Sequence, residues 1–142
     1  MDETNILDAR EWLVYAQSDL GVAKYLYETY HPKPLEIICF HCQQSAEKAV
    51  KSIIVLKGSQ GGLPKRHNID LLLNQIKNMV SVDEKYYDYA DTLEPYSVSM
   101  RYPNELFLED HHAGKAIDIA QDFFDWAKEV IDASEGELQK DD

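Results

Sequence analysis

Hydrophobic side chains recur at steps of three and four along most of the chain, which is the spacing of helices with one buried side. The first such stretch covers residues 8–30, where Asp8 and Glu11 form a capping pattern at the helix start. The Pro-containing segment 31–34 ends this helix. A second helix is predicted over residues 35–57, ended by Gly58, so the two helices form an antiparallel hairpin.

Three further helices are predicted after a glycine-containing loop. They cover residues 69–80, with Met79 on the inner face, residues 83–93, which Pro95 ends or kinks, and residues 112–133, for which Asp110 is the cap. No segment shows the alternating pattern of a β-strand. We therefore predict an all-α fold, an up-and-down antiparallel bundle of four to five helices. The bundle forms one domain over residues 1–133, and an acidic, disordered tail follows over residues 134–142.

Length and charge narrow the class of protein. A chain of 142 residues is long enough to bury a core without disulfides or metals. Its net charge of −12 argues against binding to duplex DNA, although the segment 48–67 contains basic residues and no acid. No apolar stretch reaches the roughly 18 residues of a membrane span, and no secretory leader precedes the two cysteines. We expect a cytoplasmic protein outside the membrane.

Polar side chains within the second helix indicate where function should be sought. Gln44, Glu47 and Lys51 share one helical stripe, and an apolar stripe that begins at Cys42 lies beside it. Polar side chains next to an apolar helix–helix contact form either a buried hydrogen-bond network or a binding site.

Further candidate ligands come from other segments. Arg101 is a planar cation suited to phosphate, and Tyr102 can stack on a base, but Arg101 can equally pair with Glu47 and pin the segment to the bundle. His67 can donate to phosphate, move a proton or cap the third helix. The predicted ligands of a nucleotide or phosphate are Gln44, Glu47, Lys48, Lys51, His67, Arg101 and Tyr102.

Other motifs have simpler interpretations. The C-x-x-C pair of Cys39 and Cys42 lies inside a helix without a second cysteine pair, which favours small buried thiols over a metal or redox site. His111 and His112 are adjacent at a helix start and point apart, so we expect no metal there and no cofactor elsewhere. The tyrosines at positions 86, 87, 89 and 96 can stack on nucleobases, but packing is the commoner role.

The ordered set of these motifs resembles the HEPN domains, helical bundles of prokaryotic toxin–antitoxin and nucleotidyltransferase-linked systems. Trp12-Leu13 with Asp19-Leu20 looks like the opening helix of that family. Phe40-His41, Gln43-Gln44 and Ala46-Glu47-Lys48 look like its second helix, and Arg101-Tyr102-Pro103 stands where one subgroup carries the same tripeptide.

The resemblance implies a homodimer whose cleft binds RNA or a nucleotide, with a minimal nucleotidyltransferase as a possible partner. Ribonuclease members carry an arginine and a histidine separated by four to six residues. Here nine residues separate Arg101 from His111, which disfavours catalysis. The alternatives are a metal-independent endoribonuclease toxin that uses Arg101 with His67 or His111, and a protein-interaction module without a small ligand.

Overall fold

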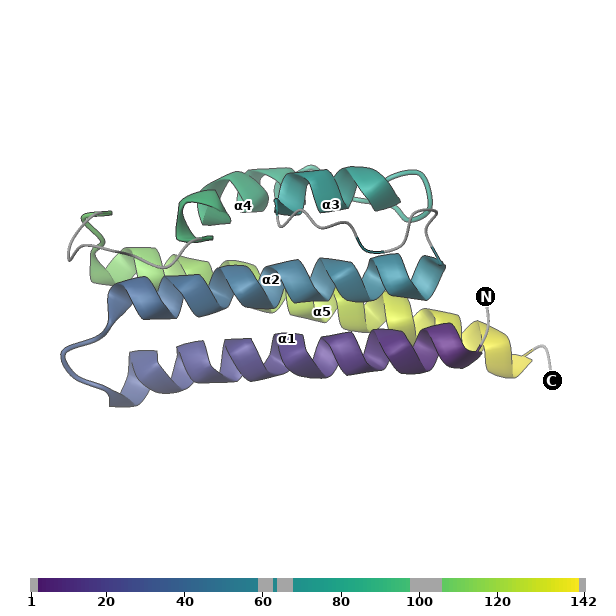
Figure 1. Cartoon of the computed structure of the whole chain (residues 1–142), viewed down its shortest axis with the longest axis horizontal. Coiled ribbons are helices and arrows are strands. Elements are labelled where there is room, and N and C mark those ends of the chain that lie inside the picture. The colour runs from purple at the N-terminus through teal and green to yellow at the C-terminus, as the bar shows by residue number, and fades with distance from the viewer. Residues whose placement is uncertain (1–2, 59–62, 64–67, 98–105, 141–142) are drawn as a thin grey trace.

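The computed structural model describes residues 3–58, 63, 68–97 and 106–140. Within these residues the chain forms five α-helices, one short 3-10 helix and no β-strand, which confirms the all-α prediction (Figure 1). The elements are α1 (Glu3–Thr29), α2 (Leu35–Lys57), α3 (Ile69–Ile76), α4 (Lys85–Leu93), η1 (Glu94–Tyr96) and α5 (Asp110–Lys140).

Three long helices make up the body of the molecule, and α2 lies at its centre. Helices α1 and α5 both pack against α2, while α3 and α4 lie on the side of α2 opposite α1 (Figure 1). Helix α1 runs antiparallel to α2, because Ala16 contacts Ser45 while the later Asp19 contacts the earlier His41. It also runs antiparallel to α5, because Arg10 contacts Asp132 while Tyr27 contacts Asp110. Helices α2 and α5 therefore run parallel to each other, because the α3–α4 segment returns the chain to the end at which α2 began.

The bounds of α2 agree with the sequence prediction at both ends. The helix begins directly after Pro34, whose ring cannot occupy a helix interior. Gly58 ends it in the left-handed conformation, with φ 59° and ψ 42°, and its N–H bonds to the carbonyls of Ile54 and Val55. Glycine adopts this conformation without the steric cost that a Cβ would add.

Several other predicted bounds are wrong, and one of them is the start of α4, which lies at Lys85 instead of residue 83. Helix α1 begins at Glu3 instead of residue 8, because Ile6 continues the buried stripe by one turn. Helix α3 ends at Ile76, and Met79 is exposed instead of lying on the inner face. Helix α5 begins at Asp110, two residues before the predicted start.

The predicted disordered tail is also wrong for residues 134–140, which extend α5. Ser134 is buried and Leu138 packs against the core, so the helical spacing of inward side chains continues past residue 133. Glu135 lies 3.4 Å from the guanidinium of Arg10 on α1. These contacts order a segment whose acidic composition alone indicated disorder.

Aromatic residues fix α4 against α5. The ring of Tyr86 stacks on Trp126 with centroids 4.4 Å apart and lies 5.0 Å from the fully buried Phe123. Burial raises the pKa of Tyr86 to about 12. Tyr89 donates a hydrogen bond to Asp122 and Tyr87 donates one to Asn74. The packing role considered for these tyrosines is therefore confirmed for Tyr86.

Ending the chain after Ala133 tests the contribution of the last turns of α5. We expect this truncation to lower the free energy of unfolding by about 1–2 kcal/mol, because it removes the packing of Leu138 and the contact of Glu135 with Arg10. Urea denaturation measures the change, with a chain ended after Lys140 as the control. Equal stability of the two chains would mean that the segment 134–140 does not contribute to the fold.

Candidate functional site

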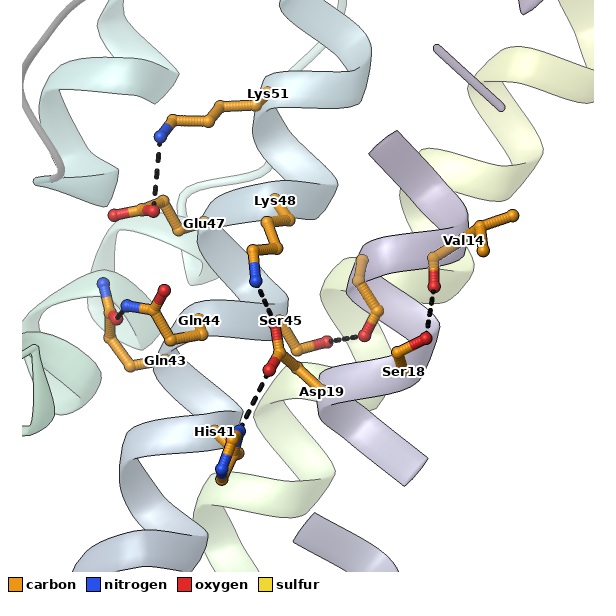
Figure 2. A network of polar contacts seen from close by, with 11 residues as sticks. Val14, Ser18, Asp19, His41, Gln43, Gln44, Ser45, Glu47, Lys48 and Lys51 are labelled. Carbon is orange, nitrogen blue, oxygen red and sulfur yellow. Dashed lines mark hydrogen bonds and ion pairs between the residues drawn. The ribbon is translucent and has the colours of Figure 1, made fainter. Parts of the chain in front are cut away.

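The candidate site is a strip of polar side chains on the central helix. Gln43, Gln44, Glu47 and Lys51 extend from one side of α2, and the hydroxyl of Ser45 points to another side, toward α1 (Figure 2). Gln43, Glu47 and Lys51 are all buried, and Gln44 is half-buried. We refer to these four residues as the polar strip.

An ion pair forms the charged part of the polar strip. Lys51 Nζ lies 3.3 Å from Glu47 Oε2, one helical turn away. Their side chains are only 8% and 4% exposed, so both groups have given up most of their hydration. The ammonium group also lies 5.7 Å from the centre of the Trp12 ring on α1. A lysine and a glutamate are rarely this deeply buried unless they are paired.

The free-energy cost of burying two charges helps to decide whether this ion pair stabilises the fold. Removing charges from water costs several kcal/mol per ion, and mutual attraction at best offsets this cost. Replacing a buried pair with apolar side chains is often neutral or stabilising, whereas removing one partner costs about 3–5 kcal/mol. The pair of Glu47 and Lys51 is thus weak evidence for a purely stabilising role.

Two amides continue the polar strip toward the start of α2. Gln44 Nε2 donates to Gln43 Oε1 at 2.8 Å, and Gln43 is 2% exposed. The sequence prediction included Gln44 but missed Gln43. The signal was present, since positions 43, 47 and 51 follow one another at steps of four.

Lys48 belongs to a different group, at the contact between α1 and α2. Its Nζ lies 2.5 Å from Asp19 Oδ2, and His41 Nδ1 lies 2.9 Å from Asp19 Oδ1 (Figure 2). One turn away, the Ser45 hydroxyl donates to the carbonyl of Ala16 at 2.7 Å. Asp19 therefore holds two side chains of α2 at once and fixes the position of α1 along α2.

His111 lies at the start of α5, at one end of the bundle. Its side chain is 69% exposed, and its Nδ1 lies 3.6 Å from Glu109 Oε2. The neighbouring Asp110 contacts Lys33, just before α2 begins. Glu47 stands twelve residues into α2, about 18 Å further along the helix. The structure therefore does not bring His111 to the polar strip.

Asp110 does not have the predicted role of a simple helix cap. Tyr27 donates a hydrogen bond to its Oδ1 at 2.7 Å and Lys33 Nζ lies 2.5 Å from its Oδ2. These two partners, Lys33 first, lower the pKa of Asp110. The backbone N–H of Glu109 is instead bonded to His112 Nδ1, one turn into the helix.

Three of the predicted ligands, His67, Arg101 and Tyr102, lie outside the described residues. Among the other four, Gln44, Glu47 and Lys51 lie together on the polar strip, and Lys48 is bound to Asp19. Asp19, which organises the contact of α1 with α2, was not among the predicted site residues.

The two cysteines are buried thiols, as predicted. Burial raises the pKa of Cys39 to about 12, and burial followed by the proximity of Cys39 raises that of Cys42 as well. His41, between them in the sequence, is bound to Asp19. Within the described part of the chain, no three histidine, cysteine, aspartate or glutamate side chains form a cluster suited to a metal ion.

Thiol labelling tests the burial of Cys39 and Cys42. We expect neither to react with Ellman's reagent in the folded protein at pH 8, because the raised pKa values keep both thiols protonated as well as shielded. Both should react in 8 M urea, where thiols have a pKa of about 8.5. Lys128→Cys, at an exposed position, should label at once in the folded protein.

The same raised pKa values predict a loss of stability at alkaline pH. As the pH rises above about 9, the thiols ionise in the unfolded chain but stay neutral in the folded protein, so the free energy of unfolding should fall. Urea denaturation at pH 8 and at pH 10 measures the change.

Comparison with known proteins identifies the family. The model of the HEPN domain family matches residues 9–130. A protein of Methanocaldococcus jannaschii, named "Putative toxin MJ1304", is 30% identical over 112 residues, which cover 74% of this chain and 70% of that protein. The helices of the described chain contain no segment long and apolar enough to cross a membrane.

Solved structures give the same result. The crystal structure of TT1696 from Thermus thermophilus matches with a TM-score of 0.73 at 26% identity, over 85% of this chain and 96% of that one. ST0689, described as an archaeal HEPN homologue, matches in fold with a TM-score of 0.66 at 24% identity, over 87% and 97% of the two chains. Sequence and fold together show that the chain belongs to the HEPN domain family.

Proposed function

We propose that this HEPN protein binds the phosphate of a nucleotide or an RNA at the polar strip of α2. It does so as a homodimeric cytoplasmic component of a toxin–antitoxin or nucleotidyltransferase-linked system. The observation that carries the proposal is the ion pair of Glu47 and Lys51, buried beside the amides of Gln43 and Gln44. These groups supply a cation, amide donors and a carboxylate from one rigid helix.

Each side chain has a distinct task in this proposal. The ammonium of Lys51 neutralises phosphate, and the low exposure of the site strengthens that attraction. The half-buried amide of Gln44 provides an N–H donor at the edge of the strip. The carboxylate of Glu47 orients Lys51 before binding and can accept a hydrogen bond from a ribose hydroxyl.

Sequence arguments add Arg101, Tyr102 and His67 to the proposed ligands. A guanidinium binds phosphate through two parallel hydrogen bonds, which a lysine cannot do. An aromatic ring next to it offers a stacking surface for a base. Because these three residues lie outside the described part of the chain, their inclusion depends on the sequence alone.

The biological setting is proposed from the family and from one relative. The word toxin stands in the name of the archaeal relative, at 30% identity. A HEPN protein of this kind would act together with a minimal nucleotidyltransferase, which would supply or modify the nucleotide. In this setting the ligand of the polar strip is the chemical link between the two proteins.

A thermal-shift measurement with ATP, ADP and inorganic phosphate tests the binding proposal. At a concentration one hundred times the dissociation constant, the bound nucleotide should stabilise the protein by about 2.7 kcal/mol. Lys51→Met and Arg101→Ala should each abolish the shift. For each variant, the shift is the change in its own thermal midpoint when nucleotide is added. Gln44→Ala should weaken it without harm to the fold, since Gln44 is only half-buried.

The matched control is Lys128→Met, which breaks an exposed i,i+4 ion pair with Asp132 on α5. This variant should keep the full nucleotide shift. A shift that survives in Lys51→Met and in Gln44→Ala would place the ligand elsewhere. No shift with any of the three compounds, together with tight binding of a purified nucleotidyltransferase, would favour the interaction module.

The endoribonuclease alternative is tested by incubating the protein with mixed cellular RNA in EDTA. We expect the RNA to remain intact, because His111 lies at the end of the bundle, away from the polar strip, and its spacing from Arg101 differs from that of the nuclease members. Cleavage that is lost in both Arg101→Ala and His111→Ala would establish the ribonuclease instead. Cleavage that both variants retain would point to a contaminating nuclease.

A further inference from the structure

Trp12 lies where the polar strip meets α1. The centre of its ring is 5.7 Å from Nζ of Lys51, so an aromatic side chain stands beside the proposed phosphate-binding cation. Trp12 and Asp19 are seven residues apart on α1 and therefore share one side of that helix. Because Asp19 contacts Lys48 on α2, this side of α1 faces α2 (Figure 2). The helical spacing of α1 thus brings the Trp12 ring to the polar strip.

Solvent reaches the polar strip along the line where α1 meets α2. Gln44, Lys48 and Lys51 follow one another at steps of four and three, so they line one side of α2. Lys48 is the member of this row that contacts Asp19 on α1. Gln44, Lys48 and Trp12 are all half-buried. A ligand that enters along this line therefore meets the indole ring and the ammonium of Lys51 together.

Trp12 differs from the other tryptophan in its ring contacts. Trp126 stacks on Tyr86, with ring centroids 4.4 Å apart. Among the described residues, Trp12 stacks on no aromatic ring and its indole N–H donates no hydrogen bond. Its distance from Lys51 approaches the limit of about 6 Å for attraction between a ring and a cation, so that contact is weak. The ring contacts and hydrogen bonds of the described chain therefore do not account for an indole at this position.

A nucleobase fits an indole that lies beside a phosphate-binding cation. In a nucleotide the ribose joins the phosphate to the base, so a phosphate at Lys51 brings its base to a neighbouring ring. Stacking on an aromatic side chain strengthens binding about 5- to 150-fold per base. A purine covers more of an indole than a pyrimidine does, and it removes more apolar surface from water.

We infer that Trp12 stacks on the base of the bound nucleotide and that the ligand is a purine nucleotide. The inference rests on the proposed function, in which Lys51 holds the phosphate. It adds a base-binding residue on α1 to a phosphate site on α2. Asp19 contributes indirectly, because its contacts with His41 and Lys48 hold α1, and the indole with it, at a fixed position along α2.

Quenching of the Trp12 fluorescence tests the stacking without any change at the site. The chain has two tryptophans, so Trp126→Phe leaves Trp12 as the only indole and keeps an aromatic ring against Tyr86. ATP should quench the emission to a saturating limit, whereas tripolyphosphate should raise the thermal midpoint without quenching. N-acetyltryptophanamide under the same conditions measures the collisional quenching that needs no site. A thermal shift with ATP but no saturable quenching would overturn the inference.

Substitution of Trp12 separates the contribution of the base from that of the phosphate. Trp12→Leu should weaken the binding of ATP about 5- to 150-fold and leave the dissociation constant of tripolyphosphate unchanged. The preference of the wild-type protein for ATP over UTP should decrease as well, and Trp12→Phe, which keeps a smaller ring, should lose less. The matched control is Tyr25→Leu, which removes a ring that is 66% exposed from the same helix and should bind ATP like the wild type. Isothermal titration calorimetry measures each affinity.

The outcomes distinguish this inference from the proposed function. If ATP and tripolyphosphate bind alike, and Trp12→Leu changes neither affinity, the stacking is overturned and the phosphate site stays in place. Equal losses for both compounds in Trp12→Leu would mean that the ring serves the fold, which also overturns the stacking. Binding of neither compound to the wild type would overturn both proposals. The quenching measurement decides the inference even if Trp12→Leu does not fold.

Discussion

The burial of the ion pair of Glu47 and Lys51 is the constraint on which the interpretation of this protein depends. Helix α2 is covered by α1, α5 and the α3–α4 segment, so nearly every side of it is interior. In such a position apolar side chains would give a stable bundle with less difficulty. The presence of a cation, a carboxylate and two amides along one stripe is therefore weak evidence for a purely stabilising role, and it is the reason that we propose a charged ligand at this place.

The rest of the fold holds this stripe in place. Asp19 fixes α1 along α2 through His41 and Lys48, and the stacking of Tyr86 on Trp126 fixes α4 against α5. A site on a rigid helix keeps its side chains within the small tolerance that specific binding requires.

Local signals predicted the fold better than the site. Pro34 and Gly58 act within one turn of the chain, and the bounds of α2 followed from them. The length of α5 could not be predicted in the same way. The acidic composition after Ala133 indicated disorder, although Ser134 and Leu138 continue the helical spacing of buried side chains. The ion pair of Lys48 with Asp19 depends on how α1 lies along α2. Helical spacing within one segment cannot predict that arrangement. Gln43 was missed although its spacing from Glu47 was visible.

The most direct test of the central claim is the free energy of unfolding of the double variant Glu47→Leu, Lys51→Met, measured in urea beside the single variant Lys51→Met. If the buried pair is kept for binding, the double variant should be as stable as the wild type or more so. The single variant should lose about 3–5 kcal/mol, because it leaves a buried carboxylate without its lysine. A double variant that is at least as unstable as the single one would show that the pair serves the fold itself, which would contradict the account.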